Sequence, residues 1–452
     1  MRRRTSLMTL ALAAAFGPAT APAAGPGADL GPIAPVAAEG GTGLQRKAAL
    51  AHGDGVYLAA WQDGDETADV DGPATDIFCA RIGPDGKPLD RKGIPVCKAK
   101  DYQLRPKVAF AGGVFLIVWE DYRNGTDGDI YAARVTPEGK VLDPEGFPVA
   151  AIAARNQVYA ALASNGKDFL VAWMDHWAYP TYGIAMARVS PSGDVAPKDG
   201  ALVIKEDDAK LKATAAKVRA SRELVIPWTR PVNYGGLVGT VNFPDLIFVG
   251  DHYLCIMNTF GGLGRRLTRV PAAGPLRAEA GPESGMKINP ERGFGHAFVA
   301  GPSQGWLYFR QDNLGRGQSE KNFFTVVVQP DGSLPKPNGN GDSATVASGG
   351  DERKIVDLNT AGAFDGRQYW LAFEAKAGVA LGRIDPQGKA SGIEFAGDKA
   401  KGQFMLATGE GCTHPALASD GKGGVMAVWT DDAGIGDARL KCRAIKGGKG
   451  GE

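Results

Sequence analysis

The segment HWAYPTYG at residues 176–183 carries the side chains best suited to binding a ligand. It places His176, Trp177, Tyr179 and Tyr182 on a short polar stretch between two apolar runs. Exposed aromatic rings bind the faces of sugars and the side chains of peptides well. The alternative is that these rings pack down on neighbouring strands. We predict that this loop contacts a protein or glycan partner.

A second candidate lies at residues 229–242, TRPVNYGGLVGTVN. Arg230 and Tyr234 stand there beside several glycines, where the regular pattern of the chain is interrupted. An insertion of this kind either forms a plain hairpin or covers a binding face as a lid. We add both side chains to the predicted ligand-binding residues.

Clustered carboxylates at residues 64–75 are the third candidate. Asp65, Asp69 and Asp71 lie within GDETADVDGPAT, and Ca²⁺ is held by carboxylate and carbonyl oxygens. The spacing of acids in an EF-hand loop is missing, and acidic surface loops are common. We therefore expect no cofactor and keep Ca²⁺ at these three residues as the alternative.

The sequence offers few catalytic motifs. The sequence contains no H-E-x-x-H zinc helix and no S-x-D-x-G-x-T-W box of the sialidase type. His296 and His414 each open a short apolar run and could point into a central channel. Paired carboxylates for glycoside cleavage stay open, because sequence gives no separation between Asp and Glu side chains. We assign no catalytic residue and lean towards a protein that is not an enzyme.

The chain has five cysteines. If the protein is exported, disulfides are permitted. The candidate pairs are Cys79–Cys97 and Cys412–Cys442, with a bridge between Cys79 and Cys412 as the rival. Cys255 lies in an apolar run and is expected to be a buried free thiol.

The elements that must position these residues repeat along the chain. Four segments alternate apolar residues and close on Trp-x-Asp: VYLAAWQD, VFLIVWED, DFLVAWMD and GVMAVWTD, ending at Asp63, Asp121, Asp175 and Asp431. Alternation with period two predicts strands, with the Trp ring in the core. A strand containing Arg follows each one, and it often runs into a Pro-x-Gly turn such as GPDGK or TPEGK. We interpret the Asp and the following Arg as a structural bridge across the hairpin.

Each unit therefore holds about four strands in about 55 residues, which is typical of propeller blades. We predict an all-β fold, a seven-bladed β-propeller with four-stranded blades, and eight blades as the runner-up. Residues 44–446 form the propeller, with an insertion around 200–290. Residues 25–43 are expected to be a flexible linker and residues 447–452 a disordered tail. The outermost strand of the last blade could come from the N-terminal segment and close the ring.

The repeats YLAAWQD…DIFCARIGPDGKPLD and FLIVWEDYRNGTDGDIYAARVTPEGKVLDPEG resemble those of exported bacterial β-propeller proteins, many of them uncharacterised. The resemblance covers about residues 44–446 and is strongest in the first three units and the last. The resemblance implies a β-propeller fold and export from the cytoplasm. That repeat family has no single chemistry, so little function transfers.

The first 24 residues are typical of a signal peptide. Arg2, Arg3 and Arg4 precede the apolar run 7–16, and Ala21-Pro22-Ala23 offers a cleavage site. That run is too short to span a membrane, and no other apolar run reaches membrane length. We predict a secreted or periplasmic protein.

The charge balance excludes one class of partner. A formal net charge of +1 leaves no basic excess to hold nucleic acid by its phosphates. We expect a non-catalytic binding module that recognises a protein or a glycan through loops on one face. The alternative is a glycoside hydrolase or lyase that uses carboxylates at the channel mouth.

Overall fold

The fold is built from β-strands. The computed structural model describes residues 28–39, 44–64, 75–153, 155–178, 181–205, 244–258, 265–277, 279, 296–312, 321–331, 344–349, 360–375, 378–386, 390–391, 404–409, 411–432 and 437–447. Within these ranges every regular element is a strand. In the same ranges there is no helix long and apolar enough to cross a membrane.

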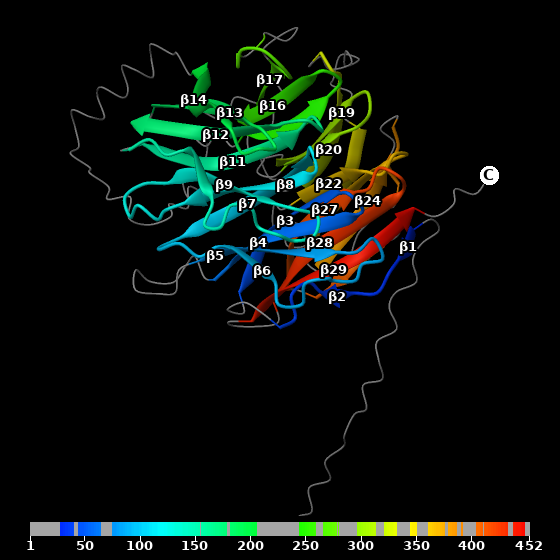
Figure 1. The fold of residues 1–452 in the computed structure, drawn as a ribbon. Helices are drawn as coiled ribbons and strands as arrows, with labels where there is room; N and C mark the ends of the chain where they lie inside the picture. The colour runs from blue at the N-terminus through cyan, green and yellow to red at the C-terminus, as the bar shows by residue number, and fades with distance from the viewer. Residues whose placement is uncertain are drawn as a thin grey trace, which may run out of the picture.

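The sheets are antiparallel and most of their strands follow one another along the chain (Figure 1). The first sheet holds β3 (Gln45–Gly53), β4 (Val56–Asp63), β5 (Asp76–Ile82) and β6 (Ile94–Cys97). The second holds β7 (Gln103–Ala111), β8 (Val114–Asp121), β9 (Asp129–Val135) and β10 (Phe147–Ala150). The third holds β11 (Asn156–Ser164), β12 (Phe169–Ala178), β13 (Thr181–Val189) and β14 (Val195–Lys205). The expected four-stranded unit is thus formed by each of the first three repeats.

The later sheets follow the same order. One holds β15 (Asp245–Val249), β16 (His252–Asn258) and β17 (Arg265–Pro271). The next holds β18 (His296–Ala300), β19 (Gly305–Asp312), β20 (Lys321–Val328) and β21 (Ala344–Gly349). Another holds β22 (Thr360–Phe364), β23 (Tyr369–Ala375) and β24 (Gly378–Ile384), with β25 (Ala390–Ser391) and β26 (Phe404–Thr408) both on β24. The last holds β27 (Cys412–Ser419), β28 (Gly424–Asp432) and β29 (Ala438–Gly447), joined by β1 (Ala28–Leu30) and β2 (Ala34–Pro35).

The first strands of the main sheets form a closed ring. β3 contacts β7, β7 contacts β11, and the series continues through β15, β18 and β22 to β27, which contacts β3 again. The sheets are therefore stacked around a common centre, and each buries its faces against its two neighbours. This arrangement is a β-propeller.

The N-terminal segment closes the ring, as expected from the sequence. Ala28 lies opposite Gly447 and Ala34 lies opposite Cys442, so β1 and β2 both pair with β29 (Figure 1). Residues 25–43 were expected to be a linker, but this part of the chain contains those two strands. Val36 and Ala37 are also buried, in the cluster that contains Trp61. Chain ends that share one sheet hold the first and last sheets together.

The repeated tryptophans fill the core between sheets. Trp61, Trp119, Trp173 and Trp429 have exposed fractions of 0–1%. Trp119 packs in one cluster with Leu58 and Ile77 of the first sheet. The prediction that these rings are core residues is confirmed, and each burial of this size stabilises the fold by about 2–3 kcal/mol.

The repeated Asp and Arg do not pair with each other, so the predicted bridge is wrong. Asp63 lies opposite Asp76 while Arg81 lies opposite Leu58, which puts them at opposite ends of the hairpin. Asp63 and Asp121 instead accept hydrogen bonds from the indole nitrogens of their own strands, at 3.3 Å from Trp61 and 2.7 Å from Trp119. At Trp61 and Trp119 the Asp therefore satisfies the one polar atom of the buried ring.

The repeated arginines link neighbouring sheets. Arg81 binds Asp90 through two nitrogens, Nε to Oδ2 at 2.9 Å and Nη2 to Oδ1 at 2.8 Å, and its Nη1 donates to the carbonyl oxygen of Pro137 in the next sheet at 3.4 Å. Arg134 repeats the pattern with Asp143 and Pro191. A forked guanidinium suits this double role. The Arg, the following Asp and the Pro-x-Gly turn of the next sheet thus form one repeated contact that links neighbouring sheets.

A glycine beneath the Trp ring yields a prediction about stability. Gly146 has φ +74°, and an added Cβ would lie 2.7 Å from Cζ2 of Trp119. Gly113 has φ +83° with no atom within 4 Å of such a Cβ, so it is a matched control. We expect Gly146→Ala to destabilise the protein by about 2–4 kcal/mol and Gly113→Ala by about 1 kcal/mol, since only the first adds a clash to the backbone strain. Urea unfolding measures both; equal losses would contradict the packing described here.

The predicted disulfides are not formed. All five cysteines are buried and free. Cys79 lies opposite Ile94, three residues before Cys97, and β28 lies between the strands that carry Cys412 and Cys442. Both separations exceed the Cα distance of about 7 Å that a disulfide tolerates. Cys79 and Cys412, the rival pair, are both free as well. Cys255 is a buried thiol as expected, and burial raises its pKa.

Candidate functional site

The aromatic loop predicted to bind a ligand is part of a longer hairpin. β12 continues through His176 and Trp177 to Ala178, and β13 starts at Thr181. His176 lies opposite Tyr182 in the ladder. The structure does not describe the side chains of residues 176–182, so ligand contact there stays a prediction.

Several other predicted site residues lie outside the described residues. These are Tyr179, Arg230, Tyr234, Asp65, Asp69 and Asp71. Among the residues that are described, no group of three or more His, Cys, Asp or Glu side chains is placed to hold a metal ion.

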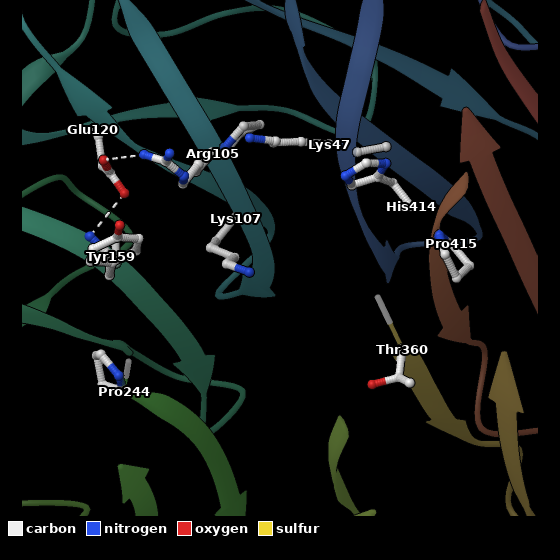
Figure 2. Close-up of a pocket in the computed structure, with 12 residues that line it drawn as sticks. Lys47, Arg105, Lys107, Glu120, Tyr159, Pro244, Thr360, His414 and Pro415 are labelled. Carbon is white, nitrogen blue, oxygen red and sulfur yellow. Dashed lines mark hydrogen bonds and ion pairs between the residues drawn. The ribbon is translucent and has the colours of Figure 1, made fainter. Parts of the chain in front are cut away.

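A cavity of about 380 Å³ lies among the first strands of the ring (Figure 2). Its polar lining comes from β3, β7, β8, β11 and β27, on opposite sides of the opening. The side chains that matter chemically are Lys47, Arg105, Lys107, Glu120, Tyr159 and His414. Figure 2 shows Glu120 beside Arg105 and Tyr159 on one side, Lys47 and His414 on the other, and Lys107 between them. Of these, sequence reasoning had singled out only His414.

A β-bulge in each of four first strands places these side chains. In β3 the register passes from Arg46↔Gln62 to Ala49↔Ala60, so two residues face the single residue Trp61. The same shift occurs in β7, β11 and β27, opposite Trp119, Trp173 and Trp429. A bulge re-aims a side chain out of the regular alternation of the strand. Four of the cavity residues lie at these bulges: Lys47, Arg105, Tyr159 and His414.

The bulges hold non-glycine residues in the left-handed region. The φ angles are 52° at Lys47, 53° at Arg105, 56° at Tyr159 and 51° at His414. Each such residue costs about 1–2 kcal/mol relative to ordinary backbone. Backbone strain of this kind persists where the surroundings fix it, and it is often found at functional sites. Four strained positions at one repeat position around one cavity indicate a pre-formed site.

At three of the four bulges, the second strand of the neighbouring sheet fixes the strained residue by a hydrogen bond. The amide of Arg105 donates to Oε1 of Gln62 at 3.2 Å, and the amide of Tyr159 donates to Oε1 of Glu120 at 2.8 Å. The amide of His414 donates in the same way to Glu374. The acceptor is always the residue after the Trp, or after Phe373 where Phe replaces it. This contact between sheets compensates for the backbone strain.

Glu120 is the centre of one half of the cavity. Its side chain is fully buried, and its Oε2 accepts a hydrogen bond from Nη1 of Arg105 at 2.8 Å. The guanidinium carbon of Arg105 lies 5.2 Å from the ring centroid of Tyr159, within the range of a cation–π contact. Both carboxylate oxygens of Glu120 are therefore used, one by a charged donor. These contacts fix the position of Arg105.

His414 occupies the other half. Its Nδ1 lies 3.0 Å from Oγ1 of Thr413 and 3.8 Å from Oε1 of Glu374. Glu374 is only 3% exposed. These contacts hold the imidazole of His414 at the cavity, and an imidazole is the side chain that most often transfers protons in enzymes.

One serine motif was missed in the sequence but lacks the structural context for catalysis. GPSQG at residues 301–305 has the G-x-S-x-G spacing of a nucleophile elbow. It forms the turn between β18 and β19, where the amide of Gly301 donates to the carbonyl oxygen of Gln304, and Ser303 is exposed. A nucleophile elbow needs a strand-to-helix turn. The cavity therefore remains the candidate site.

A second polar cluster, at the ends of β8 and β9, makes stability depend on pH. Burial, followed by the charges of Asp127 and Asp121, raises the pKa of Asp129 to about 7. A carboxyl whose pKa is higher in the folded state stabilises the fold below its ordinary pKa and loses that contribution as pH rises to about 7.

We therefore expect Asp129→Asn to raise the free energy of unfolding at pH 8 by on the order of 2 kcal/mol, and to change it little at pH 4. Urea unfolding at the two pH values checks this. Equal effects at both would contradict the raised pKa.

Comparisons with known proteins bear on the fold. No protein-family model matches the sequence, and no curated protein matches it. Similar solved structures include an ulvan lyase of a new polysaccharide lyase family, at 11% identity, covering 90% of this chain and 94% of that one, with a TM-score of 0.48. An α-L-arabinanase of Penicillium chrysogenum is 9% identical, covering 92% and 98%, with a TM-score of 0.45. A sialidase of Trypanosoma rangeli is 10% identical, covering 89% of this chain and 55% of that one, with a TM-score of 0.44.

These findings correct the first interpretation of function. The comparisons contradict the expectation of a non-catalytic binding module. The proteins of similar structure are glycoside hydrolases, sialidases and a polysaccharide lyase. At 8–12% identity the likeness concerns the fold alone. An activity has to be argued from the cavity residues of this chain.

Proposed function

We propose that the chain is an exported enzyme that cleaves glycosidic bonds, as a glycoside hydrolase or lyase, in the central cavity of a seven-bladed β-propeller. The observation that carries this is the set of four bulges, which present Lys47, Arg105, Tyr159 and His414 to one cavity at the same repeat position. A protein that only binds a ligand does not need groups that can transfer protons to meet in one cavity. A protein that acts by acid–base catalysis does need them there.

The order of the sheets along the described chain supports seven blades. Each sheet whose first strand takes part in the ring of contacts is counted as one blade. Export is supported by the charged start, the apolar run 7–16 and the Ala21-Pro22-Ala23 site. The resemblance to exported bacterial propellers agrees with both. Under this proposal the protein binds a glycan as its substrate outside the cytoplasm.

The site has the parts that glycosidic cleavage requires. Arg105 and Lys47 can bind hydroxyl oxygens or an anionic group of a sugar, and Tyr159 offers a ring for stacking on a sugar face. His414, Tyr159 and Glu120 are groups that accept or donate protons in enzymes. Because the backbone holds these groups before a substrate arrives, little reorganisation is needed on binding.

The test is direct. The chain from Gly25 onwards is purified and incubated with a panel of soluble polysaccharides, neutral and acidic, and newly formed reducing ends are measured. We expect cleavage of at least one polymer within the chain. The control is the same protein after heat denaturation. If no polymer yields reducing ends above that control, the proposed activity is wrong.

A further inference from the structure

We infer that the substrate is an anionic glycan that contains uronate residues, and that the bond is broken by β-elimination. This inference rests on the proposed function and narrows it to a substrate class and a reaction. It follows from three observations: the charge of the cavity, the hydrogen bonds that Glu120 accepts, and the groups beside it that can transfer protons.

The described lining of the cavity carries more positive charge than the chain as a whole. Lys47, Arg105 and Lys107 contribute three permanent cations to the described lining, and Glu120 contributes one carboxylate. The chain as a whole has a formal net charge of only +1. A recessed site with cations of one sign attracts an anion selectively. A neutral sugar would gain nothing from this field, whereas a sugar carboxylate would.

Glu120 is poorly suited to acid catalysis in hydrolysis. Most glycoside hydrolases use two carboxyl groups, one of which must carry a proton. In the described lining of the cavity Glu120 is the carboxylate present, and its two oxygens accept hydrogen bonds from Arg105 and from the amide of Tyr159. With both oxygens occupied as acceptors, neither is placed to give a proton to a leaving group. Glu120 is therefore a positioning residue that holds Arg105 and the Tyr159 bulge.

Elimination needs the groups that the cavity does supply. The cations would neutralise the uronate carboxylate, which makes the neighbouring C5 proton more acidic. The neutral imidazole of His414 would accept that proton, the electron pair of the C5–H bond would form a C4=C5 double bond, and the C4–O bond would break. The leaving oxygen would take its proton from the hydroxyl of Tyr159, so atoms and electrons balance without an oxidant, a reductant or water as a reactant.

The first test compares polymers in the assay above, with two readouts. The panel contains pectate and alginate, the same pectate with its carboxyl groups reduced to alcohols, a sulfated neutral glycan, and neutral arabinan. Reducing ends report any cleavage, and ultraviolet absorbance reports a C4=C5 double bond conjugated with a carboxyl group. We expect both signals from a uronate polymer and neither from the carboxyl-reduced, sulfated neutral or neutral polymers.

The outcomes separate the two proposals. Reducing ends without the double bond, or cleavage of the carboxyl-reduced, sulfated neutral or neutral polymer, would overturn this inference and leave the proposed function standing. Absence of reducing ends from every polymer would overturn both.

The second test uses charge variants. Lys47→Gln and Lys107→Gln should each raise KM for the uronate polymer at least about tenfold, since each removes a cation from the cavity. Lys87→Gln is the control, because Lys87 lies in an outer turn with 82% of its side chain exposed. Unfolding midpoints show that the variants are folded. Unchanged KM in both cavity variants would overturn the inference, and Lys47→Arg should restore binding if charge is what matters.

Discussion

Replacing Arg105 by alanine is expected to lower kcat/KM for glycan cleavage by at least about 100-fold. The guanidinium is held at the cavity by Glu120 at 2.8 Å and lies over Tyr159. Its loss removes a cation from the site and leaves the fully buried Glu120 with a hydrogen bond from the amide of Tyr159 but without its charged partner. The measurement is the initial rate of formation of reducing ends over a range of substrate concentrations.

The same variant should also lose stability, by about 3–5 kcal/mol, because a buried carboxylate without its cation is costly. Loss of activity alone would then be ambiguous. The double variant Arg105→Met with Glu120→Gln resolves this. The Gln side chain keeps an acceptor oxygen for the amide of Tyr159, and no buried charge is left. We expect stability to return to within about 1 kcal/mol of the original while activity stays lost. Activity recovered together with stability would show that Arg105 is structural only.

Removing residues 28–39 is expected to have the largest effect on stability. This segment supplies β1 and β2, which pair with β29, and the buried residues Val36 and Ala37. Its loss exposes the edge of β29 and removes the strand pairing that closes the ring. We expect the free energy of unfolding to fall by at least about 4 kcal/mol, from lost apolar burial and lost ladder hydrogen bonds.

The matched comparison is between a chain that starts at Gly25 and one that starts at Gly40. Thermal and urea unfolding, followed by tryptophan fluorescence, report on the buried rings. The shorter chain should also associate, because an uncovered strand edge pairs readily with another chain. Equal unfolding midpoints for the two chains would contradict the role of the segment in closing the ring.

The fold could be predicted because its signal is repeated. Trp61, Trp119, Trp173 and Trp429 recur on alternating strands, and alternation is dictated by the geometry of the strand itself. Ring closure by the N-terminal segment followed from counting strands. The pairing of Asp63 with Arg81 failed because sequence gives no register: the two residues lie at opposite ends of one hairpin. The disulfides failed for the same reason.

The candidate site was missed because its signal lies in the position of residues within the repeat. Lys47, Arg105, Tyr159 and His414 occupy one position in four repeats, but they differ in type and follow no catalytic motif. Their common feature is a bulge opposite a Trp, which depends on pairing between strands. Aligning the repeats would have shown that these four residues occupy one variable position. The aromatic segment 176–182 was predicted instead, because a cluster of aromatic residues can be recognised in the sequence without any register.

A crystal structure of the Glu120→Gln variant with a pectate oligosaccharide would test the central claim most directly. We predict that a sugar carboxylate lies within hydrogen-bond distance of at least two of Lys47, Arg105 and Lys107. An oligosaccharide seated on the 176–182 hairpin, with the central cavity free of sugar, would contradict the assignment of the site.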